Sequence, residues 1–402
     1  MSKFKHFLRT VPMKLYIILA AFIVFAFFSN DFGLVDIQKT AVILAAGVDK
    51  EGDTFTLSTQ IAVPQGNTAG GSATSTVTVD ANGTTVSECI SKIFSETGWV
   101  PKLVFCDLVI LGEEAAKDNA IACFDFFLRN EYMPDSAQIA VCEGTAKELL
   151  TSTSAMDDSP TQAIQKLLTQ SAQSSGKVMA NTLKQFAISY YGASESGYAP
   201  YLRTAEQQSS TPGGGSAGES GGGSGSSEGN GAHEKPTVVY NAEQTALFTK
   251  GKMTGILSRE ETFAFSLIKG KVFAGTFTAQ EQGKPVAVSI LKNDGGVSLN
   301  MKSNPKAEVS VKLVLRLFNR GVPAPVNDIA EVTMSEELLQ NAETVIRGYL
   351  DSLVTACKEA DCDLFQLRTQ LYRSSLSRFE EWKDLVPNAI ETEIKTKIEK
   401  IK

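Results

Sequence analysis

Residues 41–64 read AVILAAGVDKEGDTFTLSTQIAVP, and this stretch indicates how the folded body begins. Two runs rich in apolar and β-branched residues, 39–48 and 54–63, flank the acidic cluster DKEGD at 49–53. Runs of this kind predict strands, and a glycine within a short polar cluster predicts a turn. We therefore expect a β-hairpin at this point of the chain.

Strands and helices alternate after the hairpin. The expected elements are a strand at 75–79, a helix at 86–97, a strand at 102–111, a helix at 113–130, a strand at 138–142 and a helix that begins at Thr145. The helices are predicted from apolar residues at helical spacing. This order of elements predicts an α/β fold whose sheets have mixed strand directions.

The middle of the chain contains the tract SSTPGGGSAGESGGGSGSSEGNG at 209–231. It has almost no side chain to bury, so we expect a flexible loop or linker. Residues 238–266 follow with short strands and turns, and are too few to enclose a core of their own. We expect them to share a core with the mainly helical residues 160–191, which makes the tract an insertion at 209–234.

The last third of the chain again predicts strands, at 272–278, 286–290, 297–301 and 308–318. The sequence Thr333-Met334-Ser335-Glu336 predicts a capping box before a long amphipathic helix, and a further helix is expected at 371–379. In the tail, β-branched residues occupy every second position, which predicts a closing strand. These residues are Ile390, Thr392, Ile394, Thr396 and Ile398.

The predicted architecture is a membrane anchor followed by three small α/β domains with mixed sheets. Residues 1–31 are assigned to a cytoplasmic basic tail and a membrane span. Residues 32–155, 156–271 and 272–402 are the expected N-terminal, middle and C-terminal domains.

The N-terminal sequence predicts a membrane anchor that is retained in the mature chain. Four cations, Lys3, Lys5, Arg9 and Lys14, precede an apolar run of fourteen residues at 15–28, which covers about 21 Å of a hydrocarbon layer roughly 30 Å thick. The rings of Phe27 and Phe28 disfavour signal cleavage, although a cleaved signal stays an alternative. The cations place the N-terminus in the cytoplasm and the body outside. The anchor residues are Leu15, Tyr16, Ile17, Ile18, Leu19, Phe22, Ile23, Val24, Phe25, Phe27 and Phe28.

Composition excludes several classes of function. The formal net charge of −7 argues against nucleic acid as a partner, because phosphate binding needs clustered cations. The six cysteines form no C-x-x-C pair and have no neighbouring histidine, so no zinc site is predicted. We interpret them as small core residues, and the spacing selects no disulfide pairing.

Residues suited to catalysis are scarce. The two histidines, His6 and His233, lie before the membrane run and beside the glycine-rich tract, so His-based catalysis is not expected. The carboxylate pairs Asp157-Asp158 and Glu260-Glu261 are interpreted as a helix start and a turn. We predict no enzyme activity, no cofactor and no metal.

Residues 245–262, TALFTKGKMTGILSREET, resemble the C subunits of bacterial spore germinant receptors, the Ger(x)C family. Ranges 41–64, 104–119 and 126–150 resemble the family as well, and Asp363-Leu364-Phe365 with Trp382 match it more loosely, without the glycine usual after that Phe. The positions that match the family in 245–262 are Ala246, Leu247, Phe248, Lys252, Met253, Gly255, Leu257, Glu261 and Thr262. Within this segment the candidate motif or partner contacts are Lys252, Gly255, Arg259, Glu261 and Thr262.

The resemblance implies a noncatalytic subunit on the outer face of the inner spore membrane. It implies assembly with a membrane-bound A subunit and a multi-span B subunit, and a role in nutrient-triggered germination. One departure concerns the anchor. Ser29-Asn30 stand where the family usually carries a lipidated cysteine, and a retained span would replace the lipid.

The sequence is compatible with two other functions. The first is an extracytoplasmic solute-binding protein, which needs a cleft with converging polar and aromatic groups. The second is a membrane-tethered hydrolase that uses the carboxylate pairs.

Overall fold

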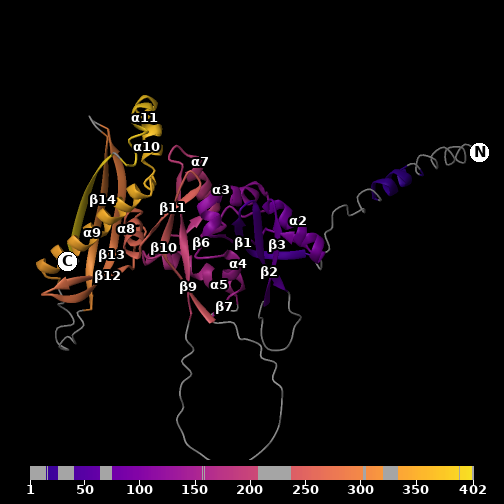
Figure 1. Ribbon diagram of the computed structural model, residues 1–402, viewed down its shortest axis with the longest axis horizontal. Coiled ribbons are helices and arrows are strands. Elements are labelled where there is room, and N and C mark those ends of the chain that lie inside the picture. Colours follow the sequence, from indigo (N-terminus) through magenta and orange to yellow (C-terminus); the bar gives the residue numbers. More distant parts are fainter. Residues whose placement is uncertain are drawn as a thin grey trace, which may run out of the picture. The chain divides into compact units, whose positions relative to one another are not determined.

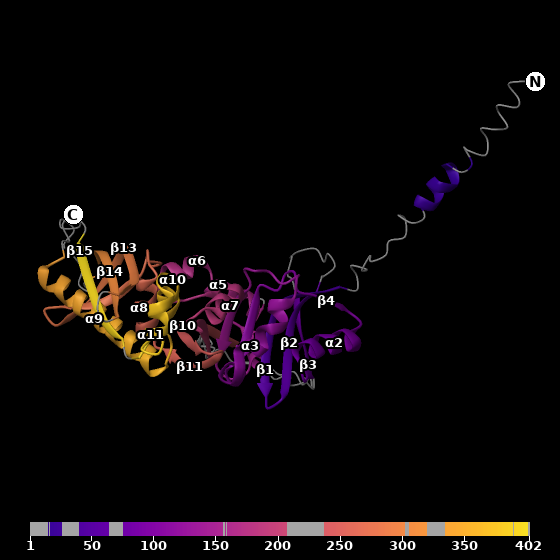
Figure 2. The same ribbon diagram turned by 90° about the horizontal axis from the view of Figure 1, so that it is seen from above.

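The structure is a computed structural model, drawn in Figures 1 and 2. It describes residues 15, 17–25, 40–63, 75–155, 157, 159–206, 237–301, 305–319, 334–388 and 390–400. The chain forms two compact units, Met1–Thr40 and Ala41–Lys402. The second unit is here called the body.

In the first unit, Leu15 and residues 17–25 are helical and their side chains are exposed. Tyr16, Phe27, Phe28, His6 and Ser29-Asn30 lie outside the described residues. Among the helices that the structure describes, none combines the length and the apolar character needed to cross a membrane.

The first sheet of the body has eleven strands, and its main path runs β11-β10-β9-β6-β5-β1-β2-β3. The predicted hairpin is confirmed, because β1 is antiparallel to β2 across a turn at 52–53. Strands β1, β5, β6 and β9 are parallel to their neighbours in that series, so the sheet is mixed as predicted. The strands are β1 (Thr40–Glu51), β2 (Thr54–Val63), β3 (Ser75–Gly83), β4 (Val100–Lys102), β5 (Leu108–Gly112), β6 (Gln138–Cys142), β7 (Thr153–Ser154), β8 (Asn181–Thr182), β9 (Ser196–Glu206), β10 (Thr237–Thr249) and β11 (Lys252–Leu257).

Helices cover both faces of this sheet. On β5, Val109 and Leu111 join one apolar core, while Leu108 and Ile110 join the core on the opposite face. Burial on both faces explains why β5 is an unbroken apolar run. Helices α3 and α7 pack on the first face, and α4 and α5 on the second (Figure 1). The helices are α2 (Val86–Thr97), α3 (Glu113–Arg129), α4 (Ala146–Thr151), α5 (Pro160–Leu167), α6 (Gln170–Ser174) and α7 (Leu183–Tyr191).

Segments on either side of the glycine-rich tract share one core, as expected. Ala163 and Ile164 of α5 pack in the same cluster as Val238 and Tyr240 of β10. The tract itself, 209–234, lies outside the described residues. The strands described between residues 40 and 257 all belong to one sheet. The division of the chain into three domains stays a prediction.

The second sheet has the order β12-β13-β14-β15. The closing strand is confirmed, and β15 is parallel to β14. Helix α9 buries its apolar stripe, which includes Leu338, Ile346 and Leu353, against this sheet (Figure 2). The elements are α8 (Arg259–Ile268), β12 (Thr276–Glu281), β13 (Lys284–Asn300), β14 (Lys306–Asn319), α9 (Glu336–Glu359), α10 (Leu367–Ser374), α11 (Leu376–Trp382) and β15 (Glu391–Lys400).

Several predicted boundaries were wrong. The ranges 286–290 and 297–301 form one strand, β13, with a register shift at 290–292. The expected strand at 102–111 is interrupted, because β4 ends at 102 and β5 begins at 108. The helix expected at 371–379 is divided at Ser375, whose extended backbone ends α10 and whose hydroxyl caps α11 by accepting the N–H of Arg378. Helix α9 is capped by Ser335, since that hydroxyl accepts the N–H of Leu338; Thr333 lies outside the described residues.

All six cysteines are buried and none forms a disulfide, which confirms their role as core residues. Burial raises the pKa of Cys106, Cys123 and Cys362 to about 12. These thiols therefore stay protonated at neutral pH and are poor nucleophiles.

Replacing residues 207–236 with a four-residue turn should leave the body folded. Glu206 at the end of β9 pairs with Val238 at the start of β10, so the two ends of the segment are already adjacent. Closing a loop of four instead of thirty residues favours folding by about 2 kcal/mol. Urea unfolding should show equal or higher stability, and a loss of several kcal/mol would contradict a passive insertion.

Candidate functional site

The segment that carries the family resemblance comprises the end of β10, the β10–β11 hairpin and the start of α8. Lys252 begins β11 and is exposed. Gly255 lies on β11 where a Cβ atom would come within 3.1 Å of the Cβ of Ala360. A side chain at this position would therefore press against the residues that follow α9.

Glu261 and Thr262 hold α8 in place. The Ser258 hydroxyl accepts the N–H of Glu261 (3.3 Å), and the Glu261 carboxylate accepts the N–H of Ser258 (2.8 Å), which completes a capping box. The second oxygen of Glu261 accepts the hydroxyl of Ser352 on α9 (2.6 Å). Thr262 is fully buried and its hydroxyl donates to that of Thr245 on β10 (3.1 Å). Both side chains thus join α8 to its neighbours.

The prediction of a turn at Glu260-Glu261 was wrong, because both residues lie in the first turn of α8. Arg259 is exposed and pairs with Glu243 (Nε to Oε2, 3.0 Å). Hence the five candidate residues do not converge: three serve packing or capping, while Lys252 and Arg259 face solvent. Of the other carboxylate pair, Asp157 binds Lys166, and Asp158 lies outside the described residues.

Residues 360–366, here called the clamp loop, follow α9 and contain the second family match. The carboxylate of Asp363 accepts the N–H groups of Leu367 and Arg368, both at 2.8 Å, and also binds the hydroxyl of Ser194. Asp363 is 1% exposed, and burial raises its pKa, while these hydrogen bonds act in the opposite direction. The buried carboxylate therefore caps the N-terminal end of α10 by accepting two of its first N–H groups.

The clamp loop also binds the large sheet. The N–H of Asp363 donates to the hydroxyl of Ser196 on β9 (3.1 Å), and the amide of Gln366 donates to the Ser196 carbonyl (3.0 Å). On β10, the Thr249 hydroxyl donates to the carbonyl of Asp361 (3.0 Å). The loop thereby ties the C-terminal elements to two strands of the first sheet.

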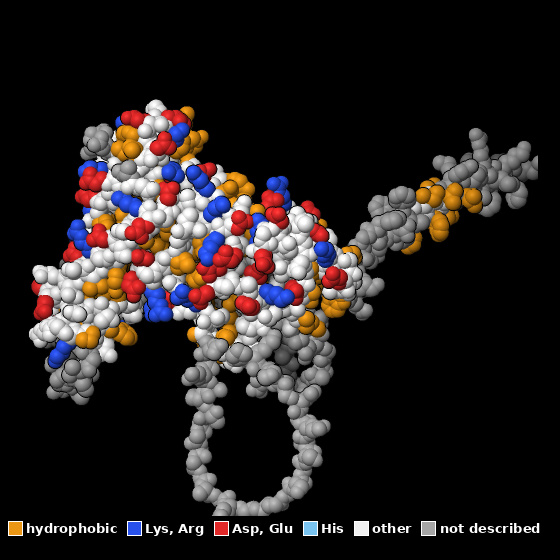
Figure 3. Space-filling model, in the orientation of Figure 1, with side chains coloured by type: hydrophobic (Ala, Val, Ile, Leu, Met, Phe, Trp, Pro, Cys, Tyr) orange, Lys and Arg blue, Asp and Glu red, His pale blue; other side chains and the backbone are white. Residues whose placement is uncertain are grey.

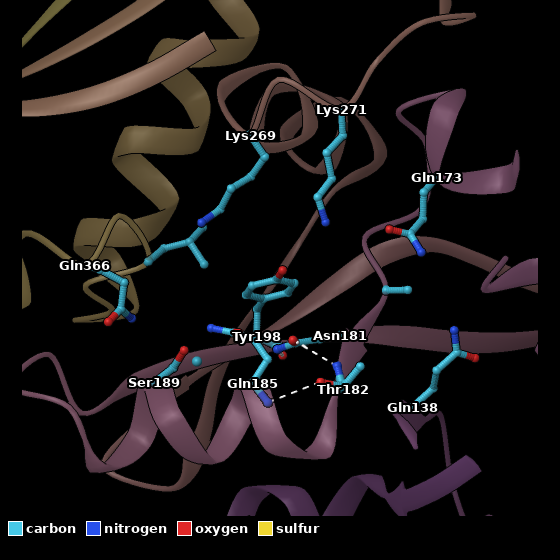
Figure 4. Close-up of a pocket in the computed structure, with 13 residues that line it drawn as sticks. Gln138, Gln173, Asn181, Thr182, Gln185, Ser189, Tyr198, Lys269, Lys271 and Gln366 are labelled. Carbon is cyan, nitrogen blue, oxygen red and sulfur yellow. Dashed lines mark hydrogen bonds between the residues drawn. The ribbon is translucent and has the colours of Figure 1, made fainter. Parts of the chain in front are cut away.

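Beside the clamp loop lies a polar hollow of about 440 Å³, here called the amide pocket (Figure 4). Helix α7, strands β8 and β9, the end of α8 and the clamp loop contribute side chains to it. Five of these side chains are carboxamides. The lining comprises Gln138, Gln173, Ala180, Asn181, Thr182, Gln185, Ser189, Gly197, Tyr198, Lys269, Lys271, Leu364 and Gln366.

The charged groups of the amide pocket are cations. Among the described residues, no carboxylate pairs with Lys269 or Lys271 or contributes to the pKa of Lys269. That pKa is lowered first by burial and then by Lys271, although solvent still reaches the Lys269 side chain. Burial raises the pKa of Tyr198 to about 12, so its phenol stays a hydrogen-bond donor at neutral pH.

The sequence carried little signal for this pocket. Its carboxamides come from positions as distant as Gln138 and Gln366, and no local motif joins them. The one local cue was the pair Lys269 and Lys271 directly after a buried apolar helix. Within the described residues, no group of acidic, cysteine or histidine side chains is arranged to hold a metal ion.

Family models match both halves of the body. Residues 34–204 match the spore germination protein N-terminal domain, and residues 243–402 match the spore germination B3/GerAC-like C-terminal domain. The chain belongs to the GerAC-like family of spore germination proteins. The glycine-rich tract lies between the two matches, and together they confirm the resemblance recognised in the sequence.

Individual relatives are more distant. The chain is 29% identical over 139 residues to YfkR of Bacillus subtilis (strain 168). YfkR is provisionally named a spore germination protein. That match covers 33% of this chain and 36% of YfkR, so it spans little more than a third of the relative. The crystal structure of the GerBC protein aligns with 89% of this chain and 97% of its own, at 14% identity and a TM-score of 0.47.

Replacing Asp363 should destabilise the body. Asp363→Ala leaves two N–H groups and a hydroxyl without their acceptor, which costs about 3 kcal/mol. Asp363→Asn keeps one acceptor oxygen and should cost about half as much. Urea unfolding measures both, with Asp351→Ala on the exposed face of α9 as the control. Equal stability of Asp363→Ala and the control would contradict a structural role for the carboxylate.

Proposed function

We propose that this chain is the noncatalytic C subunit of a spore germinant receptor, needed for nutrient-triggered germination. One observation carries the proposal. Both GerAC-like family models match the body, in order, on the two sides of the glycine-rich tract. A receptor subunit of this kind acts by presenting rigid surfaces to its partners, and the two sheets provide such surfaces.

A tether at the N-terminus is the second part of the proposal. The four cations before the apolar run 15–28 favour an anchor with the body on the outer face of the inner spore membrane. The described part of the run is helical, and its large apolar side chains are 51% to 71% exposed (Figure 3). Such a surface is unfavourable in water and suits a lipid environment.

The proposed partners are the membrane-bound A and B subunits of the receptor. Lys252 and Arg259 are the candidate contacts, because both are exposed while the other three motif residues serve the fold. Charged side chains of both signs are interspersed on the face of the body that Figure 3 shows. Specific pairing with a partner would then depend on the placement of individual charges more than on overall attraction.

The hydrolase alternative loses support from the geometry of Glu261. Both of its oxygens accept hydrogen bonds within the fold, from Ser258 and Ser352. A carboxylate used in this way is not free to act as a general base. The feature that bears on the solute-binding alternative is the amide pocket.

Deleting residues 15–28 should move the chain from the membrane fraction of spores to the soluble fraction. The full chain should resist salt and alkaline washes and be released by detergent, because apolar side chains hold it. Immunoblots of the fractions measure this, and intact mass shows whether the N-terminus is retained. The full chain in the soluble fraction, or normal nutrient-triggered germination without the chain, would overturn the proposal.

Charge reversal at the motif should weaken receptor assembly. Lys252→Glu and Arg259→Glu should each lower co-purification of the A and B subunits with the tagged chain by several-fold, with unchanged thermal stability. Lys312→Glu, at an exposed position on β14, is the matched control and should have no effect. Equal co-purification in all three variants would refute the assigned contacts.

A further inference from the structure

We propose that the amide pocket binds a small polar anion, whose carboxylate or phosphate oxygens are held by Lys269, Lys271 and Tyr198. This inference goes beyond the role in a receptor and does not depend on it. It rests on three features of the pocket: two cations that no carboxylate of the described residues pairs with, a positioned phenol and a wall of carboxamides.

The two cations lack a counter-charge in the part of the chain that the structure describes. Lys269 and Lys271 follow α8 directly, and their side chains extend into the same hollow (Figure 4). The ring of Phe265 lies 5.3 Å from the Lys269 ammonium and holds it by a cation–π contact. Two like charges at one cavity repel each other, so an anion between them stabilises both.

Tyr198 provides a third donor aimed at the same space. Figure 4 shows its hydroxyl between the ends of Lys269 and Lys271. The ring packs edge-on against Phe265, with centroids 5.0 Å apart. The carbonyl of Tyr198 accepts the side-chain amide of Asn181 at 2.8 Å. Phe265 thus positions both Lys269 and Tyr198, so the donors are arranged before a ligand arrives.

The carboxamides make the rest of the wall polar and uncharged. The Nε2 groups of Gln138 and Gln173 both donate to the carbonyl of Leu168, at 3.0 and 3.1 Å. This anchoring leaves their oxygens as acceptors. The preferred ligand is therefore a small anion that also carries a hydroxyl or amino donor. A volume of about 440 Å³ suits a small molecule.

The test is a titration of the purified full chain in detergent at constant ionic strength. The probes are L-malate for a carboxylate source, glycerol 3-phosphate for a phosphate source and glycerol as the uncharged control. At least one anion should raise the unfolding temperature with saturation, and glycerol should not. Which anion binds more tightly assigns the source.

Variants make the result specific to the pocket. Lys269→Gln with Lys271→Gln should weaken binding at least tenfold, and Tyr198→Phe, which keeps the ring against Phe265, should weaken it several-fold. Lys312→Gln is the control and should bind as the unmodified chain does. No saturable binding of either anion, or equal binding by the double variant, would overturn the inference. Neither failure would affect the receptor role, which is read out in spores.

Discussion

The buried carboxylate of Asp363 is the interaction on which the arrangement of the body depends. It accepts two backbone N–H groups at the start of α10 and the hydroxyl of Ser194. The backbone N–H of the same residue donates to Ser196 of β9, so the clamp loop is fixed to the first sheet. One apolar core then extends across the contact, because Leu247 of β10 and Val288 of β13 belong to the same cluster. A directional polar contact sets the geometry, and the apolar core supplies most of the stability.

The residues that carry the family resemblance gather where the two sheets meet. Gly255 allows close approach of Ala360, Glu261 bonds to Ser352 of α9, and Asp363 holds the clamp loop. A sequence motif that looks like a functional site is thus largely a structural contact between elements distant in the chain. The same contact forms one wall of the amide pocket, since Leu364 and Gln366 line it.

Local patterns predicted the elements that expose one face to solvent. The alternation in β15 follows from a face that is partly buried against the core, and the apolar stripe of α9 follows from a buried face, so both sequences could be interpreted directly. Helix α8 was missed because residues 262–268 are buried on every side, which removes the helical periodicity. The amide pocket could not be predicted, because its carboxamides become neighbours only through long-range packing.

The central claim is that the clamp loop joins the two sheets into one cooperative body. Native-state hydrogen exchange on the full chain tests it most directly, by comparing amides of β10 with amides of β14. The account predicts that the slowest amides of both strands exchange with the same opening free energy, as parts of one unit. Slow amides of β14 that open at a clearly lower free energy than those of β10 would contradict it.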